Sequence, residues 1–390
     1  MQTVLMSKVS FFQKKKHICL SYLRSPTVEH NDVLKHQWDL ANGSLCRVDF
    51  PSNAFSFETY QGKILGSEKI YTDFNRLFNH YKKSRSLAVF LQSPYSEHYP
   101  PWFLEVSSEC NFAFAGYGIS LSNYVDGQFR TPLIQSSKYL LASSNYDYIG
   151  YKNNVSGNGQ IIFTGNPLMY EIRKSLDIQK AVKGTAGLKL LWAPHWSKFW
   201  LEGSRGFARW QITLEPILEF ARRNPDIEIL VRPHPILLEA LRAHLEDNAH
   251  LFNRESQVSV NSEIDSGYIL LFKELLTLEN VSFSKSSLKD DVLTSTHLVT
   301  DGVSIIAYWA TTGKPILLVN DSESPSFNED GLRLMNEIEV ASDSKEISNW
   351  LKLITLNRNF RIHDPLVNLS KSLHPTFEES PAAIFMRTLD

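Results

Sequence analysis

Two short segments in the second half of the chain carry residue types that bind anions. Residues 231–235 (VRPHP) and 300–304 (TDGVS) each follow an apolar run that is predicted to be a buried strand. In α/β sheets, ligands bind at the carboxyl ends of the strands. A guanidinium from Arg232, an imidazole from His234 and the start of a helix at Ser304 would suit a phosphate-bearing ligand there.

Arg232 and His234 are two residues apart, and each precedes a proline. A residue before proline is pushed toward extended geometry, and extended residues two apart point to the same side. We therefore expect both side chains to project to the same side. The planar guanidinium of Arg232, which can donate two parallel hydrogen bonds, suits a phosphate better than the imidazole of His234 does. The alternative is that Arg232 pairs with an acidic neighbour and His234 caps the next helix.

In the second segment, Asp301 is expected to cap the helix that follows, and Gly302 would let a ligand approach the backbone. The free N–H groups from Ser304 onward would point at an anion. The charge of Asp301 would repel a nearby phosphate, so this carboxylate must face away or bind ribose or a cation. An ordinary N-cap without a ligand is the alternative.

Two more loops follow predicted strands. In the loop at 193–197 (APHWS), His195 stands beside Trp196, on which a base or sugar could stack. A tryptophan of the core fits the same pattern. The loop at 116–118 places Tyr117 between two glycines, which predicts a tight loop facing an interdomain cleft, with a plain turn as the alternative.

The elements that must position these loops alternate between strands and helices. This alternation predicts parallel sheets, with strands near residues 86–92, 111–115, 160–164, 188–193, 227–231, 297–300 and 315–319. Helical spacing covers residues 210–223, 303–312 and 345–356. A GTAG stretch at 184–187 is the candidate linker. We predict an N-terminal Rossmann-like domain (1–182), a C-terminal Rossmann-like domain (183–372), and an apolar tail (373–390) docking back on the protein.

Composition excludes several classes of function. The net charge of −2 argues against a nucleic-acid partner, and no apolar run approaches the ~18–20 residues that span a bilayer. The GxSxG, GxGxxG, GxxxxGK[ST], CxxC and HExxH patterns of hydrolases, NAD enzymes, P-loop ATPases and metal sites are missing. No cofactor and no metal are expected. We expect a cytoplasmic protein, with peripheral contact at the inner face of the cell membrane through Lys14–Lys16 as an alternative to a solvated turn.

The second half resembles the CDP-glycerol glycerophosphotransferase family, the teichoic-acid polymerases and their relatives. That family carries an Ala-Pro-Thr-Trp-type loop, an Arg-x-His segment, a Thr-Asp-x-x-Ser segment and a Gly-Lys-Pro strand entry. Over about residues 188–320, the similar segments here are 193–196, 232–234, 300–304 and 313–315, in the same order. In the weaker first half, Gly165-Asn166-Pro167 is similar to the family's Gly-x-Pro turn, and Tyr117 stands where the family has a histidine.

The resemblance implies a GT-B-like α/β architecture, with two Rossmann-type domains facing a central cleft. It makes the N-terminal domain (1–182) the acceptor side and the C-terminal domain (183–372) the nucleotide-donor-binding side. It also implies a transferase of cell-surface polysaccharide biosynthesis that moves a glycerol-phosphate-like group from a CDP-activated donor to the hydroxyl of a glycan or lipid-linked acceptor. A glycosyltransferase with a nucleotide-sugar donor would need the same diphosphate grip. A non-catalytic scaffold is the third possibility, motivated by the tyrosine at the family's histidine position.

The resemblance also implies roles for individual residues. Donor and phosphate binding falls on Arg232, Trp196 and the second segment, namely Thr300, Asp301, Gly302 and Ser304. The catalytic candidates are His195, His234 and Tyr117. Since tyrosine titrates near 10, it is a poor base at pH 7, and His195 is the candidate replacement.

Overall fold

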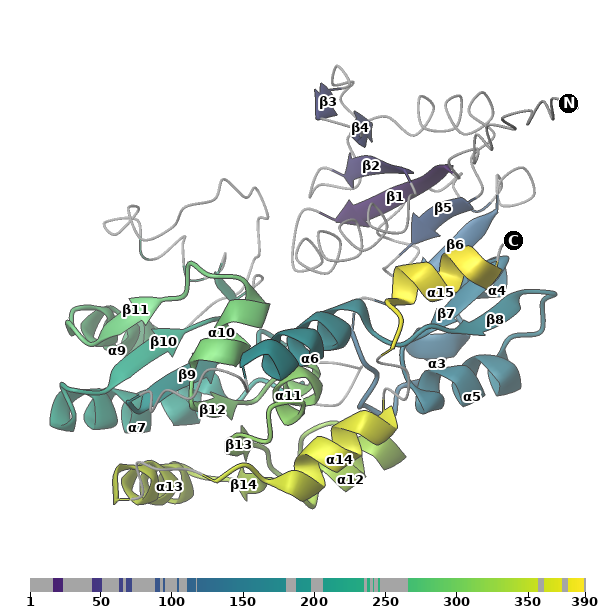
Figure 1. Ribbon diagram of the computed structural model, residues 1–390. Coiled ribbons are helices and arrows are strands. Elements are labelled where there is room, and N and C mark those ends of the chain that lie inside the picture. Colours follow the sequence, from purple (N-terminus) through teal and green to yellow (C-terminus); the bar gives the residue numbers. More distant parts are fainter. Residues whose placement is uncertain are drawn as a thin grey trace, which may run out of the picture.

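The computed structural model describes residues 17–23, 44–50, 63–65, 68–71, 88–91, 94, 104, 111–116, 118–179, 187–197, 206–234, 237–238, 241, 245, 266–356, 361–373 and 378–388. These residues form two sheets, one in each half of the chain (Figure 1). Strands alternate with helices along most of this length, so the predicted α/β class is confirmed. In the described part of the chain, no helix is both long and apolar enough to cross a membrane.

The C-terminal sheet has six strands, all parallel: β9 (Lys189–Ala193), β10 (Glu228–Val231), β11 (Val281–Phe283), β12 (His297–Thr300), β13 (Ile316–Val319) and β14 (Glu339–Ala341). Their order across the sheet is β11-β10-β9-β12-β13-β14. Counted from β9, this is the 3-2-1-4-5-6 order of the Rossmann fold. The order reverses between β9 and β12, which is where such sheets bind ligands.

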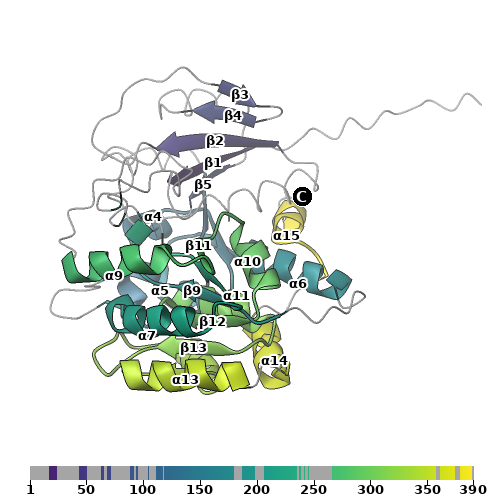
Figure 2. The ribbon, with the colours of Figure 1, turned by 90° about the vertical axis from the view of Figure 1, so that its left-hand side faces the viewer.

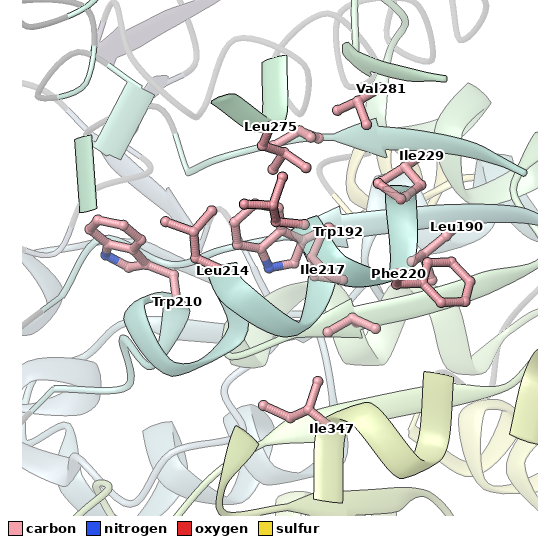
Figure 3. Packing of buried hydrophobic residues seen from close by; sticks show 14 of the residues in the cluster. Leu190, Trp192, Trp210, Leu214, Ile217, Phe220, Ile229, Leu275, Val281 and Ile347 are labelled. Carbon is pink, nitrogen blue, oxygen red and sulfur yellow. The ribbon is translucent and has the colours of Figure 1, made fainter. Parts of the chain in front are cut away.

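One face of this sheet packs against α7 (Trp210–Arg223), α9 (Ser266–Leu276) and α13 (Ser344–Leu356). Successive side chains of a strand point to opposite faces. Leu190 and Trp192 of β9 therefore join this core, where Trp192 packs on Phe272 of α9 at 5.7 Å between ring centroids. Figure 3 shows this cluster between the strands and α7, and Figure 2 shows α7 beside α13.

The opposite face carries α10 (Leu288–Thr294), α11 (Val303–Ala310) and α14 (Asp364–Leu373). Leu191 and Ala193, which alternate with Leu190 and Trp192 along β9, belong to this second core. Helix α6 (Pro167–Gln179) follows the last strand of the N-terminal sheet, yet Leu168, Met169 and Ile172 pack here. The predicted linker and the boundary at 182/183 fall almost wholly in 180–186, outside the described residues.

The N-terminal sheet consists of β1 (His17–Leu23), β2 (Ser44–Phe50), β3 (Lys63–Leu65), β4 (Glu68–Tyr71), β5 (Ala88–Leu91), β6 (Phe112–Ala115), β7 (Tyr139–Ala142) and β8 (Gln160–Phe163). Its order is β3-β4-β2-β1-β5-β6-β7-β8, and only β3 runs antiparallel to its neighbour. From β4 to β7 this again follows the Rossmann order. Short helices α3 (Val125–Phe129), α4 (Pro132–Gln135) and α5 (Asn145–Asn154) connect its later strands.

Two further helices are α12 (Glu329–Met335) and α15 (Pro381–Thr388). Helix α15 lies beside the N-terminal sheet, where the ring of Phe385 meets that of Tyr139 at 5.6 Å (Figure 1). Phe385 is fully buried there. The end of the chain therefore packs on its first half.

A short backbone seam joins the two halves. Ser122 and Phe327 form an isolated antiparallel bridge. Beside it, the N–H of Asn123 donates to Ser326 O at 2.9 Å, and the side-chain amide of Asn328 donates to Ser120 O at 2.6 Å. Because backbone hydrogen bonds fix register, the seam sets how the loop after β6 meets the C-terminal half.

Buried carboxyl groups lie close to this seam. Asp147 of α5 is buried and accepts hydrogen bonds from the hydroxyls of Ser120 and Ser144. Burial, with a smaller contribution from the charge of Asp330 in α12, raises the pKa of Asp147 to about 7. Burial also raises the pKa of Asp330. The folded state is therefore more stable when at least one of these two carboxyl groups is protonated.

The variant Asp147→Asn should make stability less dependent on pH. Folded Asp147 holds its proton more tightly than the unfolded chain does, so its contribution is complete below pH ~4 and is lost as pH rises to about 7. At ~1.4 kcal/mol per pKa unit the whole shift corresponds to about 4 kcal/mol, and we expect the parent to lose about 3 kcal/mol of this between pH 4.5 and 8 while the variant keeps it. Urea unfolding at pH 4.5 and 8 measures the difference.

The matched control is Asp126→Asn, which changes an exposed carboxylate of α3 (side chain 76% exposed). Its stability should follow the parent at both pH values. Equal pH dependence in Asp147→Asn and the parent would show that Asp147 does not hold a proton in the folded state.

Candidate functional site

Four of the predicted site residues meet at the carboxyl ends of β9, β10 and β12. The imidazoles of His195 and His234 lie 5.0 Å apart between centroids, at 62°. A Cβ added to Gly302 would lie 3.4 Å from Cδ2 of His195, so His195 also adjoins the start of α11. Trp196 is 39% exposed and stands 5.9 Å from His234. This is the edge where the strand order of the sheet reverses.

Backbone pairing explains why His195 and His234 come together. Past the end of β10, the N–H of Arg232 donates to Trp192 O at 2.8 Å, and the N–H of His234 donates to Pro194 O at 2.8 Å. The extended geometry predicted for residues before proline thus continues the parallel pairing beyond both strands. It brings the segment of His234 alongside that of His195.

Asp301 holds two loops together. Its carboxylate accepts the backbone N–H of His195 at 2.6 Å and the backbone N–H of Arg209. The predicted helix cap was wrong, because the N-cap of α11 is Gly302 and no side chain caps it. The carboxylate serves the loops instead of the helix end. Burial raises the pKa of Asp301 to about 7, although its hydrogen bonds act in the opposite direction.

Thr300 is fully buried and closes the turn between β12 and α11. Its hydroxyl donates to Ala193 O at 2.7 Å and accepts the N–H of Gly302 at 2.9 Å. Both polar partners belong to the backbone of the two strand-end loops. Thr300 and Asp301 thus build the framework on which His195 and α11 are placed.

The N-terminal half reaches this framework through Gly118. A Cβ added to Gly118 would lie 3.8 Å from Cβ of Ser304 and 3.8 Å from the hydroxyl of Tyr308, so the loop stands against the first turns of α11. Ser304 is half-buried. The catalytic candidate Tyr117 lies outside the described residues.

The guanidinium of Arg232 contacts α10 and the segment before it. Nη1 of Arg232 donates to Asp291 at 2.7 Å, to Ser286 O at 2.9 Å and to Ser284 Oγ at 3.3 Å. Asp291 of α10 is fully buried. The alternative expected from sequence, in which Arg232 pairs with an acidic neighbour, is therefore the one observed. A phosphate contact by Arg232 stays a prediction.

Three polar residues that sequence reasoning missed support the site. Arg209 makes a two-pronged pair with Asp321, Nε to Oδ2 at 2.6 Å and Nη2 to Oδ1 at 2.7 Å. This pairing lowers the pKa of Asp321 to about 2. Ser197 contacts His195 through its hydroxyl. The partners Arg209 and Asp321 are 112 positions apart, so no local pattern in the sequence signals them.

Lys314, from the Gly-Lys-Pro segment, is structural. Its ammonium is buried and donates to three backbone carbonyls at the end of α10, Val292 O and Leu293 O at 2.8 Å and Ser295 O at 2.7 Å. Burial lowers the pKa of Lys314 to about 8. A cation at the C-terminal end of a helix offsets the partial negative charge of the helix dipole there.

The two histidines of the site are neutral at pH 7. Burial lowers the pKa of His195 to about 4. The pKa of His234 is also well below its usual value, because of burial and the nearby His195. Among the described residues, no group of three or more His, Cys, Asp or Glu side chains is placed to hold a metal ion. The arrangement suits hydrogen bonding to an anion at the start of α11.

No protein-family model and no curated protein match this sequence. The fold has solved counterparts. UDP-GlcNAc 2-epimerase from Neisseria meningitidis, bound to UDP-GlcNAc, aligns with a TM-score of 0.54 at 11% identity, covering 96% of this chain and 98% of the epimerase.

Two further solved structures align over a similar length. UDP-GlcNAc 2-epimerase from Methanocaldococcus jannaschii, in complex with UDP-GlcNAc and UDP, gives a TM-score of 0.55 at 13% identity, over 96% and 99% of the two chains. The wall teichoic acid polymerase TagF aligns with a TM-score of 0.55 at 12% identity, covering 97% of this chain and 88% of the polymerase. These likenesses establish the GT-B fold and confirm that part of the prediction.

Proposed function

We propose that this chain is a GT-B enzyme that acts on a nucleotide-activated donor and holds the donor's diphosphate at the start of α11. The observation that carries the proposal is the convergence of His195, His234 and the uncapped end of α11 where the strand order reverses. Ligands of open α/β sheets bind at this position, and helix N-termini bind phosphate.

Each component of the site suits a part of such a donor. The N–H groups in the first turn of α11 have no side-chain cap and can donate to phosphate oxygens. The imidazoles of His195 and His234 can add hydrogen bonds without adding charge. The exposed ring of Trp196 offers a face for the base or sugar. The names of the fold neighbours, which include complexes with UDP-GlcNAc, support this choice of ligand class.

The finer proposal is transfer of a glycerol-phosphate-like group from a CDP-activated donor to a glycan hydroxyl. In that reaction the acceptor oxygen forms a bond to the β-phosphorus, the bond from that phosphorus to the bridging oxygen breaks, and CMP leaves with the bridging oxygen. Positioning and charge stabilisation dominate such transfers. The wall teichoic acid polymerase among the fold neighbours supports this version.

A second candidate is an enzyme that converts the sugar of a nucleotide sugar. The epimerases among the fold neighbours favour it. Glycosyl transfer from such a donor uses the same diphosphate grip. Product analysis separates the three reactions: a phosphate-containing product linked to the acceptor supports the first, a bare sugar on the acceptor supports glycosyl transfer, and an altered sugar without any acceptor supports conversion.

A thermal-shift screen of the purified full chain tests the common proposal. UDP, CDP, UDP-GlcNAc, CDP-glycerol and CDP-ribitol are compared with UMP and with inorganic phosphate. A ligand that binds only the folded protein raises its melting temperature. We expect a dose-dependent rise with at least one diphosphate and a smaller one with UMP. A screen in which no diphosphate raises the melting temperature would contradict the proposal.

The variant Trp196→Ala should bind the best nucleotide of that screen about fivefold to tenfold more weakly, because the base or sugar loses its stacking partner. Isothermal titration calorimetry measures the change. Tyr148→Ala is the matched control, because Tyr148 on α5 is exposed to the same degree, 38% against 39%. Equal affinities in both variants would exclude Trp196 from the binding site.

A further inference from the structure

The hydrogen bonds of His195 determine which of its ring nitrogens carries the proton. The backbone N–H of Ser197 points at Nδ1 of His195 at 3.3 Å, and the Ser197 hydroxyl lies 2.8 Å from the same nitrogen. A backbone N–H can only donate, so Nδ1 must be an acceptor. A neutral imidazole has one proton, and in this geometry it resides on Nε2.

Ser197 is held firmly enough to impose this choice. The residue is fully buried, and its Oγ accepts the N–H of Phe207 at 3.1 Å. Its carbonyl accepts the N–H of Ala208 at 2.9 Å. Because Oγ already accepts one hydrogen bond, its own proton is available to donate to Nδ1. Gly206 packs so closely on Ser197 that an added Cβ would overlap it.

The edge of the His195 ring that faces the start of α11 includes the carbon next to Nε2. This carbon, Cδ2, lies 3.4 Å from the position of a Cβ added to Gly302, and it is bonded to Nε2. The N–H of this ring edge is therefore close to the place proposed for the diphosphate. With Nδ1 occupied by Ser197, the ring has no free lone pair to take a proton.

We propose that Ser197 locks His195 in the tautomer with its proton on Nε2, so that His195 donates a hydrogen bond to an oxygen of the bound donor and is not the general base. The identity of the ligand in this inference rests on the proposed function, whereas the tautomer of His195 does not depend on it. Ser197 is a positioning residue. The depressed pKa of His195 agrees, because the ring stays neutral throughout the physiological range. The acceptor's proton then leaves by another group.

Two substitutions distinguish a donor from a base. In His195→Gln, an amide N–H can reach the position of Nε2–H, but the side chain cannot take a proton at neutral pH. We expect His195→Ala to bind the nucleotide diphosphate about tenfold to hundredfold more weakly than the parent, the scale of a hydrogen bond to a charged group. His195→Gln should recover a substantial part of this loss in both affinity and turnover. Full-length protein and calorimetry with the nucleotide found in the screen provide the measurement.

The opposite pattern would overturn the inference. If both variants bind the nucleotide as the parent does and both lose turnover to the same extent, His195 is a base. If His195→Gln is as weak a binder as His195→Ala, the N–H of Nε2 is not the group that contacts the ligand.

A spectroscopic test needs no ligand and separates this inference from the proposed function. Long-range 1H–15N correlation spectra of the full chain report which ring nitrogen of each histidine is protonated. We expect one histidine, identified by its absence in His195→Gln, to show a protonated Nε2 and a bare Nδ1 from pH 5.5 to 8. A protonated Nδ1 would refute the lock even if every nucleotide bound well.

Ser197→Ala removes the nearer of the two donors to Nδ1 and leaves only the longer bond from the backbone N–H at 3.3 Å, which holds the tautomer less firmly. This signal should therefore shift toward a mixture of tautomers, and nucleotide binding should weaken about threefold to tenfold. Ser295→Ala is the control, since Ser295 is an equally buried serine at the end of α10. It should change neither the His195 signal nor the affinity. If Ser197→Ala does not fold, the spectrum of the parent still decides the tautomer.

Discussion

Replacing Arg232 with methionine is expected to lower the free energy of unfolding by about 3 kcal/mol. The substitution removes the cation from a pair in which Asp291 is almost wholly buried, with 1% of its side chain exposed, and Arg232 is 22% exposed. A carboxylate left without its partner in the interior bears the cost of lost solvation. Methionine keeps an unbranched apolar stem in place of the arginine methylenes, so lost packing of the stem contributes little. Urea unfolding at pH 7 provides the measurement.

The double variant Arg232→Met/Asp291→Asn is the control, because it removes both charges together. Most of the lost stability should return, since a neutral amide costs less to bury than a charge. The phosphate contact predicted from sequence would be supported by a different result. In that result, the single variant Arg232→Met is as stable as the parent, but its affinity for nucleotide diphosphates falls tenfold or more. In that case the guanidinium serves the ligand and its pairing with Asp291 is secondary.

Asp301→Ala should be nearly as damaging, with about 3 kcal/mol of stability lost. Two buried backbone N–H groups, those of His195 and Arg209, would lose their acceptor, at ~1–3 kcal/mol for each buried unsatisfied group. Since both loops then move, nucleotide affinity should fall at least tenfold as well. Denaturant unfolding and calorimetry measure the two effects on the same protein.

Asp301→Asn tests the reason for this loss. Its amide retains one oxygen acceptor, so it can satisfy one of the two N–H groups, and about half of the stability should remain. A variant Asp301→Ala with parental stability but weaker nucleotide binding would show that the carboxylate acts on the ligand and not on the loops.

The strands and helices that shape the site could be predicted from sequence because their signals are local. The continuous apolar run of β9 and the helical spacing of α7 placed both elements within one residue of their observed bounds. Helix α11 ends two residues earlier than expected, at Ala310. Gly313 follows in a left-handed conformation (φ 67°), where an added Cβ would strike Val367 of α14. Strands of three residues, such as β11, are too short for a periodic signal.

The side-chain partners at the site could not be predicted, because they come from distant parts of the sequence. Arg232 is 59 positions from Asp291, and His195 is 106 positions from Asp301. The sequence correctly placed Arg232 and Asp301 at strand ends, but strand-end position says nothing about which way a charged side chain turns. Only the packing of α10 and the loop before α7 settled that. His195 and His234 were easier, since extended backbone beside a neighbouring strand brings them together.

The position of α15 bears on how the protein emerges from the ribosome. Phe385 packs against Tyr139 of β7, yet the whole C-terminal sheet is translated between them. At a synthesis rate of ~5–20 residues per second, the surface around Tyr139 stays exposed for on the order of ten to fifty seconds before α15 has been synthesised. Until then this apolar patch is open to chaperones or to another nascent chain. Shortening the protein before Pro381 should therefore reduce its soluble yield even though the proposed nucleotide site lies elsewhere.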